Sequence, residues 1–335
     1  MNCPSIFLLG FFLSDNFENS IQSSNFIYPG KLIFVKINIR PFLSRVIFSP
    51  SEKRFRAGWR IMIQSSLLLF FLLITNIPFI LLSFTPINID KLYLISSVAA
   101  SLLAITLSIY LSRKFLDHRN FVSLGLEFNS NVFYDLLVGT LIPGLMMGLI
   151  FCIEYFFGWI TINGFVWNSL PIIEILIGLA SSFLLYIAVA WQEELLSRGY
   201  HLQNLMEGIS TSCGVLTSSL LFSILHLLNP YASWRSIIGI TLAGIFLCYA
   251  YLRTHQLWLS IGLHLGWNFF QGPIFGFPVS GTESFMLIKQ SAIGPEIITG
   301  GLFGPEAGLI LLPALLLGFC SIYFYGLVRH KKNYS

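Results

Sequence analysis

The chain has 335 residues, of which 55% are hydrophobic, 16% are aromatic and only 10% are charged. A soluble domain carries roughly a quarter charged residues, so this composition excludes an ordinary water-soluble fold. The formal net charge of +4 comes from basic clusters between apolar runs, a pattern that indicates membrane orientation and headgroup contact and argues against nucleic-acid binding.

Residues 1–50 differ in character from the rest of the chain. The apolar stretch Ile6 to Leu13 is too short to cross a bilayer, and no basic residue precedes it as in a secretory signal. We therefore expect residues 1–50 to be a poorly ordered N-terminal extension, or an over-long start to the chain, and residues 51–335 to form one membrane domain.

Eight later runs are apolar over about the 20 residues that a helix needs to cross the hydrocarbon core. They lie near residues 62–85, 92–112, 134–159, 172–192 (continuing helically to about 205), 212–228, 236–252, 257–275 and 306–328. The sequence thus predicts an all-α fold, a polytopic membrane helical bundle with about eight transmembrane helices.

Positive charge is concentrated in every second connection between these runs. The basic connections carry Lys53, Arg54, Arg56 and Arg60; Arg113, Lys114 and Arg119; Arg198 and His201; Arg253; and Arg329, Lys331 and Lys332. The positive-inside rule then predicts that both termini are cytoplasmic, with Arg235 as the one discordant charge. The long connection 272–305 is expected to be a simple extracytoplasmic loop, with a cover over an active-site mouth as the alternative.

The five cysteines are Cys3, Cys152, Cys213, Cys248 and Cys320, and they lie far apart without a CxxC pair. Four of them lie inside or beside apolar runs. An odd number of widely separated cysteines indicates neither a disulfide framework nor a zinc-finger site.

Two adjacent carboxylates, Glu193 and Glu194, end the fourth apolar run and are followed by Arg198. Neighbouring residues lie about 100° apart around a helix, so the two carboxylates face different ways. Glu194 and Arg198 have the favourable i,i+4 order for an ion pair, which leaves Glu193 free for chemistry. The alternative is a cytoplasmic helix end with a surface ion pair.

Two further polar pairs occur on later runs. Phe222 and His226 share a helix face, so the aromatic ring can hold the imidazole, although a lone histidine in an apolar helix is more often a packing residue. His264 and Asn268 also share a face, where an imidazole and an amide can stabilise a developing oxyanion. Interhelical hydrogen bonding is the alternative for this pair.

Together the three runs resemble the CPBP family of intramembrane proteases, which includes the Rce1-type CAAX prenyl endopeptidases. The family motifs EExxxR, FxxxH and HxxxN appear complete and in order, from Glu193 to Arg198, Phe222 to His226 and His264 to Asn268. Residues 56–60 and 123–126 also resemble the lead-in of bacterial members. The resemblance covers about residues 52–330, with a core at about 134–275, so residues 51–335 are interpreted as the protease domain.

The resemblance implies an endopeptidase that hydrolyses a peptide bond of a membrane-embedded or lipid-modified protein, prenylated proteins being one such class. Glu193 and His226 would hold and deprotonate a water, while His264 and Asn268 would form the oxyanion side, and Glu194, Arg198 and Phe222 would support them. Glu193, His226 and His264 also match a catalytic zinc set of two histidines and a carboxylate. The chain has no HExxH, and a glutamate–histidine pair can activate water directly, so a divalent metal is left open.

Other functions fit less well. Tyr134 and Asp135 superficially resemble half of an aspartyl intramembrane protease, but no GxGD supplies the second carboxylate, so a packing role at the start of a span is expected. The competing function is a catalytically silent membrane protein of the same fold, such as a transporter, an immunity factor or a scaffold. The enzyme hypothesis predicts that Glu193, His226, His264 and Asn268 converge on one cavity that water reaches from the cytoplasm.

One difficulty concerns depth in the membrane. If the fourth span starts near residue 172, Glu193 arrives near the cytoplasmic face, whereas His226 lies near the far end of the fifth span. The two side chains meet only if the fourth span enters the membrane later, which places Glu193 to Arg198 inside the bilayer, or if the fifth helix starts below the surface and tilts.

Overall fold

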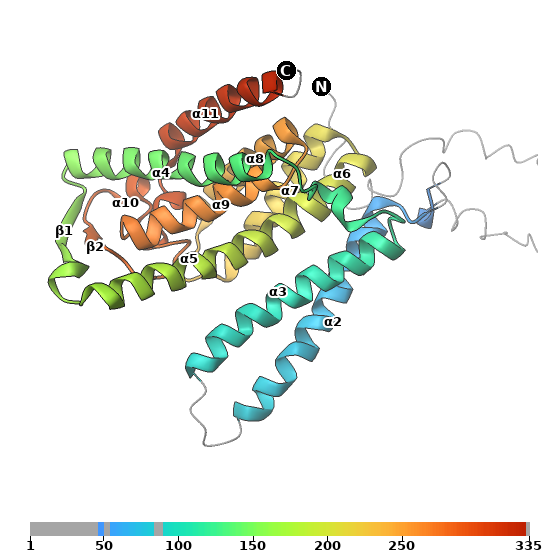
Figure 1. Ribbon diagram of the computed structural model, residues 1–335, viewed down its shortest axis with the longest axis horizontal. Coiled ribbons are helices and arrows are strands. Elements are labelled where there is room, and N and C mark those ends of the chain that lie inside the picture. The colour runs from blue at the N-terminus through green and yellow to red at the C-terminus, as the bar shows by residue number, and fades with distance from the viewer. Residues whose placement is uncertain (1–45, 50–53, 84–89, 333–335) are drawn as a thin grey trace, which may run out of the picture.

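The computed structural model describes residues 46–49, 54–83 and 90–332. Its helices are α2 (Ala57–Ser83), α3 (Asp90–Phe115), α4 (Val132–Phe156), α5 (Ile172–Glu194), α6 (Leu202–Gly208), α7 (Thr211–Leu225), α8 (Trp234–Thr254), α9 (Trp258–Phe269), α10 (Glu296–Thr299) and α11 (Leu311–Lys332) (Figure 1). The expectation for residues 1–50 lies outside the described residues, apart from 46–49.

Seven of the described helical segments are long and apolar enough to cross a membrane. They correspond to seven of the eight predicted runs, so the all-α polytopic bundle is confirmed. The run 257–275 instead forms the 12-residue α9 and a π-helical segment, Phe270–Ile274. Every residue from Leu259 to Asn268 is buried, so α9 is enclosed by other helices and does not need the apolar length of a lipid-facing span.

The fourth span continues helically beyond Arg198, close to the predicted end at about residue 205, and this removes the difficulty with depth. Helix α5, a π-helical segment (Leu195–His201) and α6 form one continuous run of 37 residues, Ile172–Gly208. Glu193 lies 15 residues before Gly208, and His226 lies 15 residues after the start of α7 at Thr211. At about 1.5 Å per residue, both side chains lie about 22 Å from the same turn and therefore at the same depth.

Serine caps fix where α7 and α8 begin. The Ser210 hydroxyl accepts a hydrogen bond from the Cys213 backbone N–H at 3.3 Å, and Ser233 and Ser236 form a reciprocal capping box at the start of α8. A serine cap satisfies an N–H group that has no partner within the helix. The cap at Ser210 therefore sets the start of α7, the helix that ends just before His226.

Helices α4 and α9 pack against each other through glycines. A Cβ atom added to Gly139 would lie 2.7 Å from the Leu259 carbonyl oxygen, and one added to Gly266 would lie 2.3 Å from the Thr140 carbonyl oxygen. Small residues at such an interface let two helix backbones approach closely, which membrane proteins use to associate helices. Because Gly266 lies between His264 and Asn268, this contact sets the position of both side chains.

Ion pairs account for two further charged residues, Asp135 and Arg235. Asp135 on α4 is buried and accepts hydrogen bonds from the Tyr325 hydroxyl at 2.6 Å and from Arg329 Nη2 at 2.9 Å. It therefore has a structural role, as expected, and joins α4 to α11. Arg235, the discordant charge, pairs with Glu296 at 2.8 Å on the side where α8 begins.

The connection after α9 folds back onto the bundle, which corrects the expectation of a simple loop. Strand β1 (Ile160–Phe165) pairs antiparallel with β2 (Ile288–Ala292), with Ile160 opposite Ala292. Figure 1 shows this sheet at the end of the bundle opposite α6. The same connection meets the end of α7, where the Asn229 amide donates to the Ser280 carbonyl at 3.1 Å. The strands escaped prediction because they are short and pair across 120 or more residues.

Candidate active site

The two glutamates at the end of α5 have different surroundings. Glu194 is fully buried and accepts a hydrogen bond from Arg198 at 2.8 Å, so the predicted ion pair is present. The Arg198 guanidinium lies over the Phe222 ring, 4.2 Å from its centroid. Glu193 has no arginine or lysine partner among the ion pairs of the described residues, and 28% of its side chain is exposed.

Both histidines are held through Nδ1. His226 Nδ1 lies 2.8 Å from the Phe222 carbonyl oxygen, and His264 Nδ1 lies 2.7 Å from Glu194 Oε1. Because both of those oxygens accept, each Nδ1 carries the hydrogen and donates it. The Phe222 ring packs against His226, with centroids 4.7 Å apart, which is the aromatic contact that the sequence predicted. Each ring is thus oriented with Nε2 pointing away from its support.

The two Nε2 atoms converge on one carboxylate oxygen. Glu193 Oε2 lies 3.7 Å from His226 Nε2 and 3.7 Å from His264 Nε2. These separations are too long for direct hydrogen bonds, and this buried oxygen has no hydrogen-bond partner among the described residues. In a neutral His226 ring, Nε2 is an acceptor that faces a second acceptor. A molecule that donates to both, such as water, fits between them.

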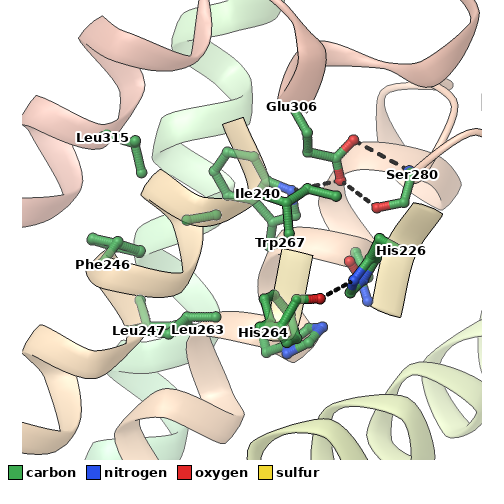
Figure 2. A pocket seen from close by; sticks show the side chains of 13 residues that line it. His226, Ile240, Phe246, Leu247, Leu263, His264, Trp267, Ser280, Glu306 and Leu315 are labelled. Atoms are coloured by element: carbon green, nitrogen blue, oxygen red, sulfur yellow. Dashed lines mark hydrogen bonds between the residues drawn. The ribbon is translucent and has the colours of Figure 1, made fainter. Parts of the chain in front are cut away.

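A small cavity adjoins the histidines on the side toward α8 and α11. Its volume is about 50 Å³, which exceeds the roughly 10–15 Å³ that one water requires. Its polar lining includes His226, His264 and Asn268, and its apolar wall comes mainly from α8 and α9 (Figure 2). Asn268 is buried one helical turn beyond His264. The structure therefore places three of the predicted residues on one cavity, with Glu193 in contact distance of its histidines.

The sequence did not reveal Glu306, a further carboxylate that lines this cavity. Glu306 is buried and accepts hydrogen bonds from Gln271 Nε2 at 2.8 Å, Ser280 Oγ at 3.1 Å, Ser280 N at 3.2 Å and Trp267 Nε1 at 3.3 Å. Figure 2 shows its carboxylate directed at Ser280. Burial raises the pKa of the Glu306 carboxyl above its ordinary value, while these hydrogen bonds lower it. One indication of this site is present in the sequence, namely that the acidic residue Glu306 begins the last apolar run, 306–328.

The predicted metal ligands are Glu193, His226 and His264, in which Glu193 Oε2 lies 3.7 Å from each histidine Nε2. Among residues 46–49, 54–83 and 90–332, no group of three or more histidine, cysteine, aspartate and glutamate side chains is arranged so that it could hold a metal ion. The described cysteines are free thiols.

These features define a polytopic membrane protein in which two glutamates and two histidines from three helical segments lie close together inside the bundle. Residues 175–270 match the family model described as type II CAAX prenyl endopeptidase, Rce1-like. The match runs from α5 to α9 and includes all three motifs, so it supports the resemblance to the Rce1-type CAAX proteases that the motifs indicated. Neither the curated proteins nor the solved structures contain a significant match.

Proposed function

We propose that this protein is an intramembrane endopeptidase that hydrolyses a peptide bond of a membrane-embedded or lipid-modified protein. One observation carries the proposal: Glu193 Oε2, which has no hydrogen-bond partner within the described part of the chain, faces His226 Nε2 and His264 Nε2 at 3.7 Å each. A carboxylate that is held near two oriented imidazoles and left without a hydrogen bond has the geometry of a water-activating base. A fold that was only a scaffold would have no use for this arrangement.

In the proposed reaction, Glu193 and His226 bind a water between them. Glu193 removes one proton as the water oxygen forms a bond to the carbonyl carbon of the substrate. Asn268 and a protonated His264 donate hydrogen bonds to the developing oxyanion, and Glu194 stabilises the positive imidazolium through Nδ1. The C–N bond then breaks, and the proton held by Glu193 passes to the leaving amine, which restores the carboxylate.

Detection of new peptide ends in membrane proteins would test this function. Membranes containing the wild-type protein are compared with membranes containing the His226→Gln variant, and free α-amino groups are labelled and identified by mass spectrometry. We expect N-termini that are present only with the wild type and that lie within or beside apolar or lipid-modified segments. Identical sets of termini would favour a catalytically silent protein of the same fold, such as a transporter, an immunity factor or a scaffold.

Removal of divalent metals is expected to leave hydrolysis unchanged. Glu193 lies where it can take a proton from a water bound to His226, so the proposed reaction needs no metal ion. Activity would be measured after dialysis against a chelator, with and without added zinc. Loss of activity that zinc restores would show that the two histidines and Glu193 close around an ion, as in catalytic zinc sites.

Replacement of Gly266 by alanine is expected to reduce hydrolysis by about 10²-fold and to lower the melting temperature. The new Cβ would lie 2.3 Å from the Thr140 carbonyl oxygen, a backbone atom that cannot rotate away, so α9 must shift with His264 and Asn268. A displacement of about 1 Å can cost this much in rate. Gly148→Ala on α4 is the matched control, because its Cβ would meet only Phe275 Cζ at 3.8 Å. Equal activity of both variants would contradict the role assigned to this contact.

For orientation, we propose that both termini are cytoplasmic and that the protein resides in the inner or plasma membrane. Arg54 and Arg60 at the start of α2, and Arg113 at the end of α3, lie on one side of the bundle, as the positive-inside rule requires. A tag added after Ser335 is expected to be cleaved by an added protease only when the cytoplasmic face is open. Cleavage from the outer side alone would overturn this orientation.

A further inference from the structure

Arginines gather where α2, α3 and α6 reach the same side of the bundle. We call Arg54, Arg56, Arg60, Arg113 and Arg119 the arginine cluster. Arg54 and Arg60 flank the start of α2, Arg113 lies in the last turn of α3, and Arg119 follows in the next loop. The membrane spans on these helices end at Ala57, Phe115 and Gly208, which places the cluster at the level of lipid headgroups.

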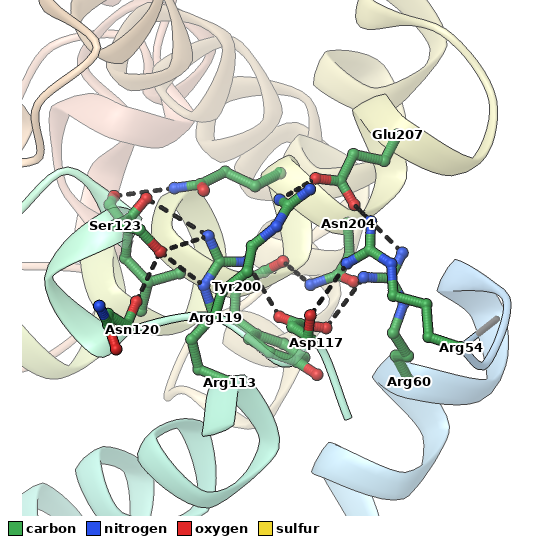
Figure 3. Close-up of polar contacts among 12 residues, drawn as sticks. Arg54, Arg60, Arg113, Asp117, Arg119, Asn120, Ser123, Tyr200, Asn204 and Glu207 are labelled. Atoms are coloured by element: carbon green, nitrogen blue, oxygen red, sulfur yellow. Dashed lines mark hydrogen bonds and ion pairs between the residues drawn. The ribbon is translucent and has the colours of Figure 1, made fainter. Parts of the chain in front are cut away.

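The carboxylates of the cluster are shared by several arginines (Figure 3). Glu207 at the end of α6 pairs with Arg54 at 3.1 Å, with Arg60 at 3.2 Å and with Arg119. Asp117 pairs with Arg60 and with Arg113, at 2.9 Å each. Among the described residues, four guanidinium groups therefore share these two carboxylates.

Several guanidinium nitrogens still lack an acceptor. Nε of Arg56 and Nε of Arg60 are buried and have no hydrogen-bond partner among the described residues. A buried donor without an acceptor costs free energy. An anion with several oxygens would offer acceptors to the guanidinium groups of this cluster.

The surroundings of the cluster show what kind of anion fits. The Arg119 side chain is 40% exposed and the Glu207 side chain 28%, so this part of the cluster is open to its surroundings. Along the adjoining helices, Met62 on α2 and Phe115 on α3 expose more than half of their surface, as lipid-facing residues do. Charge beside a lipid-facing apolar surface matches an amphiphile with an anionic head.

We infer that the arginine cluster is a binding site for an anionic phospholipid, with the phosphate against the guanidinium groups and the acyl chains along α2 and α3. Guanidinium groups bind phosphate oxygens in bidentate fashion, and basic clusters beside cytoplasmic helix ends bind acidic headgroups. The lipid joins the α2–α3 hairpin to the end of α6, the helix that is continuous with the catalytic segment of α5. The site stands independently of the proposed function.

The test uses the full chain in nanodiscs of phosphatidylcholine, with or without phosphatidylglycerol. Phosphatidylglycerol is expected to raise the melting temperature by about 3 °C or more, because a ligand that binds only the folded state stabilises it. Native mass spectrometry should show phosphatidylglycerol retained in preference to phosphatidylcholine. Equal melting temperatures in both lipids, without preferential retention, would overturn the inference.

Variants and a soluble anion locate the effect and identify its source. The double variant Arg56→Gln/Arg119→Gln should lose most of the increase caused by phosphatidylglycerol, whereas Lys289→Gln, an exposed charge on β2 at the opposite end, should keep it. An equal increase in the double variant would place the lipid elsewhere. Inorganic phosphate in phosphatidylcholine nanodiscs should give no increase; the same increase would mean a phosphate site without lipid specificity.

Discussion

The Glu193→Gln variant is expected to lose peptide hydrolysis by a factor of about 10² to 10⁴, the usual contribution of a general base. Glutamine keeps the shape of the side chain but cannot take a proton from the water that Glu193 and His226 are proposed to bind. Because Glu193 Oε2 has no hydrogen-bond partner among the residues that the structure describes, the substitution removes no hydrogen bond of that atom. Helix content and melting temperature are expected to be unchanged or slightly higher.

The measurement is the initial rate of cleavage of a membrane substrate by purified protein in detergent, alongside circular dichroism of the same samples. Glu296→Gln is the matched control: it makes the same chemical change at a carboxylate that is 65% exposed and paired with Arg235. The control should retain the wild-type rate. A rate within a few-fold of wild type for Glu193→Gln would remove Glu193 from the catalytic assignment.

Much of the candidate site could be predicted because it is built from pairs four residues apart. Glu194 with Arg198 and Phe222 with His226 meet in the structure as the sequence predicted, since residues at i and i+4 share a helix face. Such contacts depend only on local helix geometry. The apolar runs likewise predict helices, because a backbone in lipid must satisfy its own hydrogen bonds.

Depth in the membrane could not be predicted from composition alone. The fourth apolar run ends near residue 192, and composition alone does not show that its helical continuation, predicted to about residue 205 and observed to Gly208, lies inside the bundle. Arg198 is tolerated inside the bundle because Glu194 and the Phe222 ring both compensate its charge. A hydropathy count treats a charged residue as the end of a span, even when the residue is buried with two partners, as Arg198 is.

Glu306 and the covering connection depend on long-range contacts. Glu306 binds Trp267, Gln271 and Ser280, which are 26 to 39 residues away, and no spacing rule links them. The same holds for the hydrogen bond between Glu194 and His264, 70 residues apart, which the sequence did not indicate. The motifs predict which residues belong to the candidate site. The hydrogen bond between His264 and Glu194 shows how the third motif contacts the first.

The stability of Glu194 and Arg198 variants would separate the roles of the two glutamates. Both side chains of the pair are almost fully buried, so removing either partner strands a buried charge, which typically costs about 3 to 5 kcal/mol. Glu194→Ala and Arg198→Ala are each expected to lower the melting temperature, and the double variant should recover part of the loss. The decrease should be larger for Glu194→Ala, because it also removes the partner of His264 Nδ1.

Glu193→Ala is expected to behave differently, since among the described residues Glu193 forms ion pairs only with the two histidines and its Oε2 has no hydrogen-bond partner. Its melting temperature in detergent should equal or exceed that of the wild type. The exposed pair of Arg235 and Glu296 is the control, because breaking a surface ion pair typically costs under about 1 kcal/mol. Losses that simply add at Glu194 and Arg198, with an equal loss at Glu193, would mean that the two adjacent carboxylates are not divided into a structural and a catalytic group.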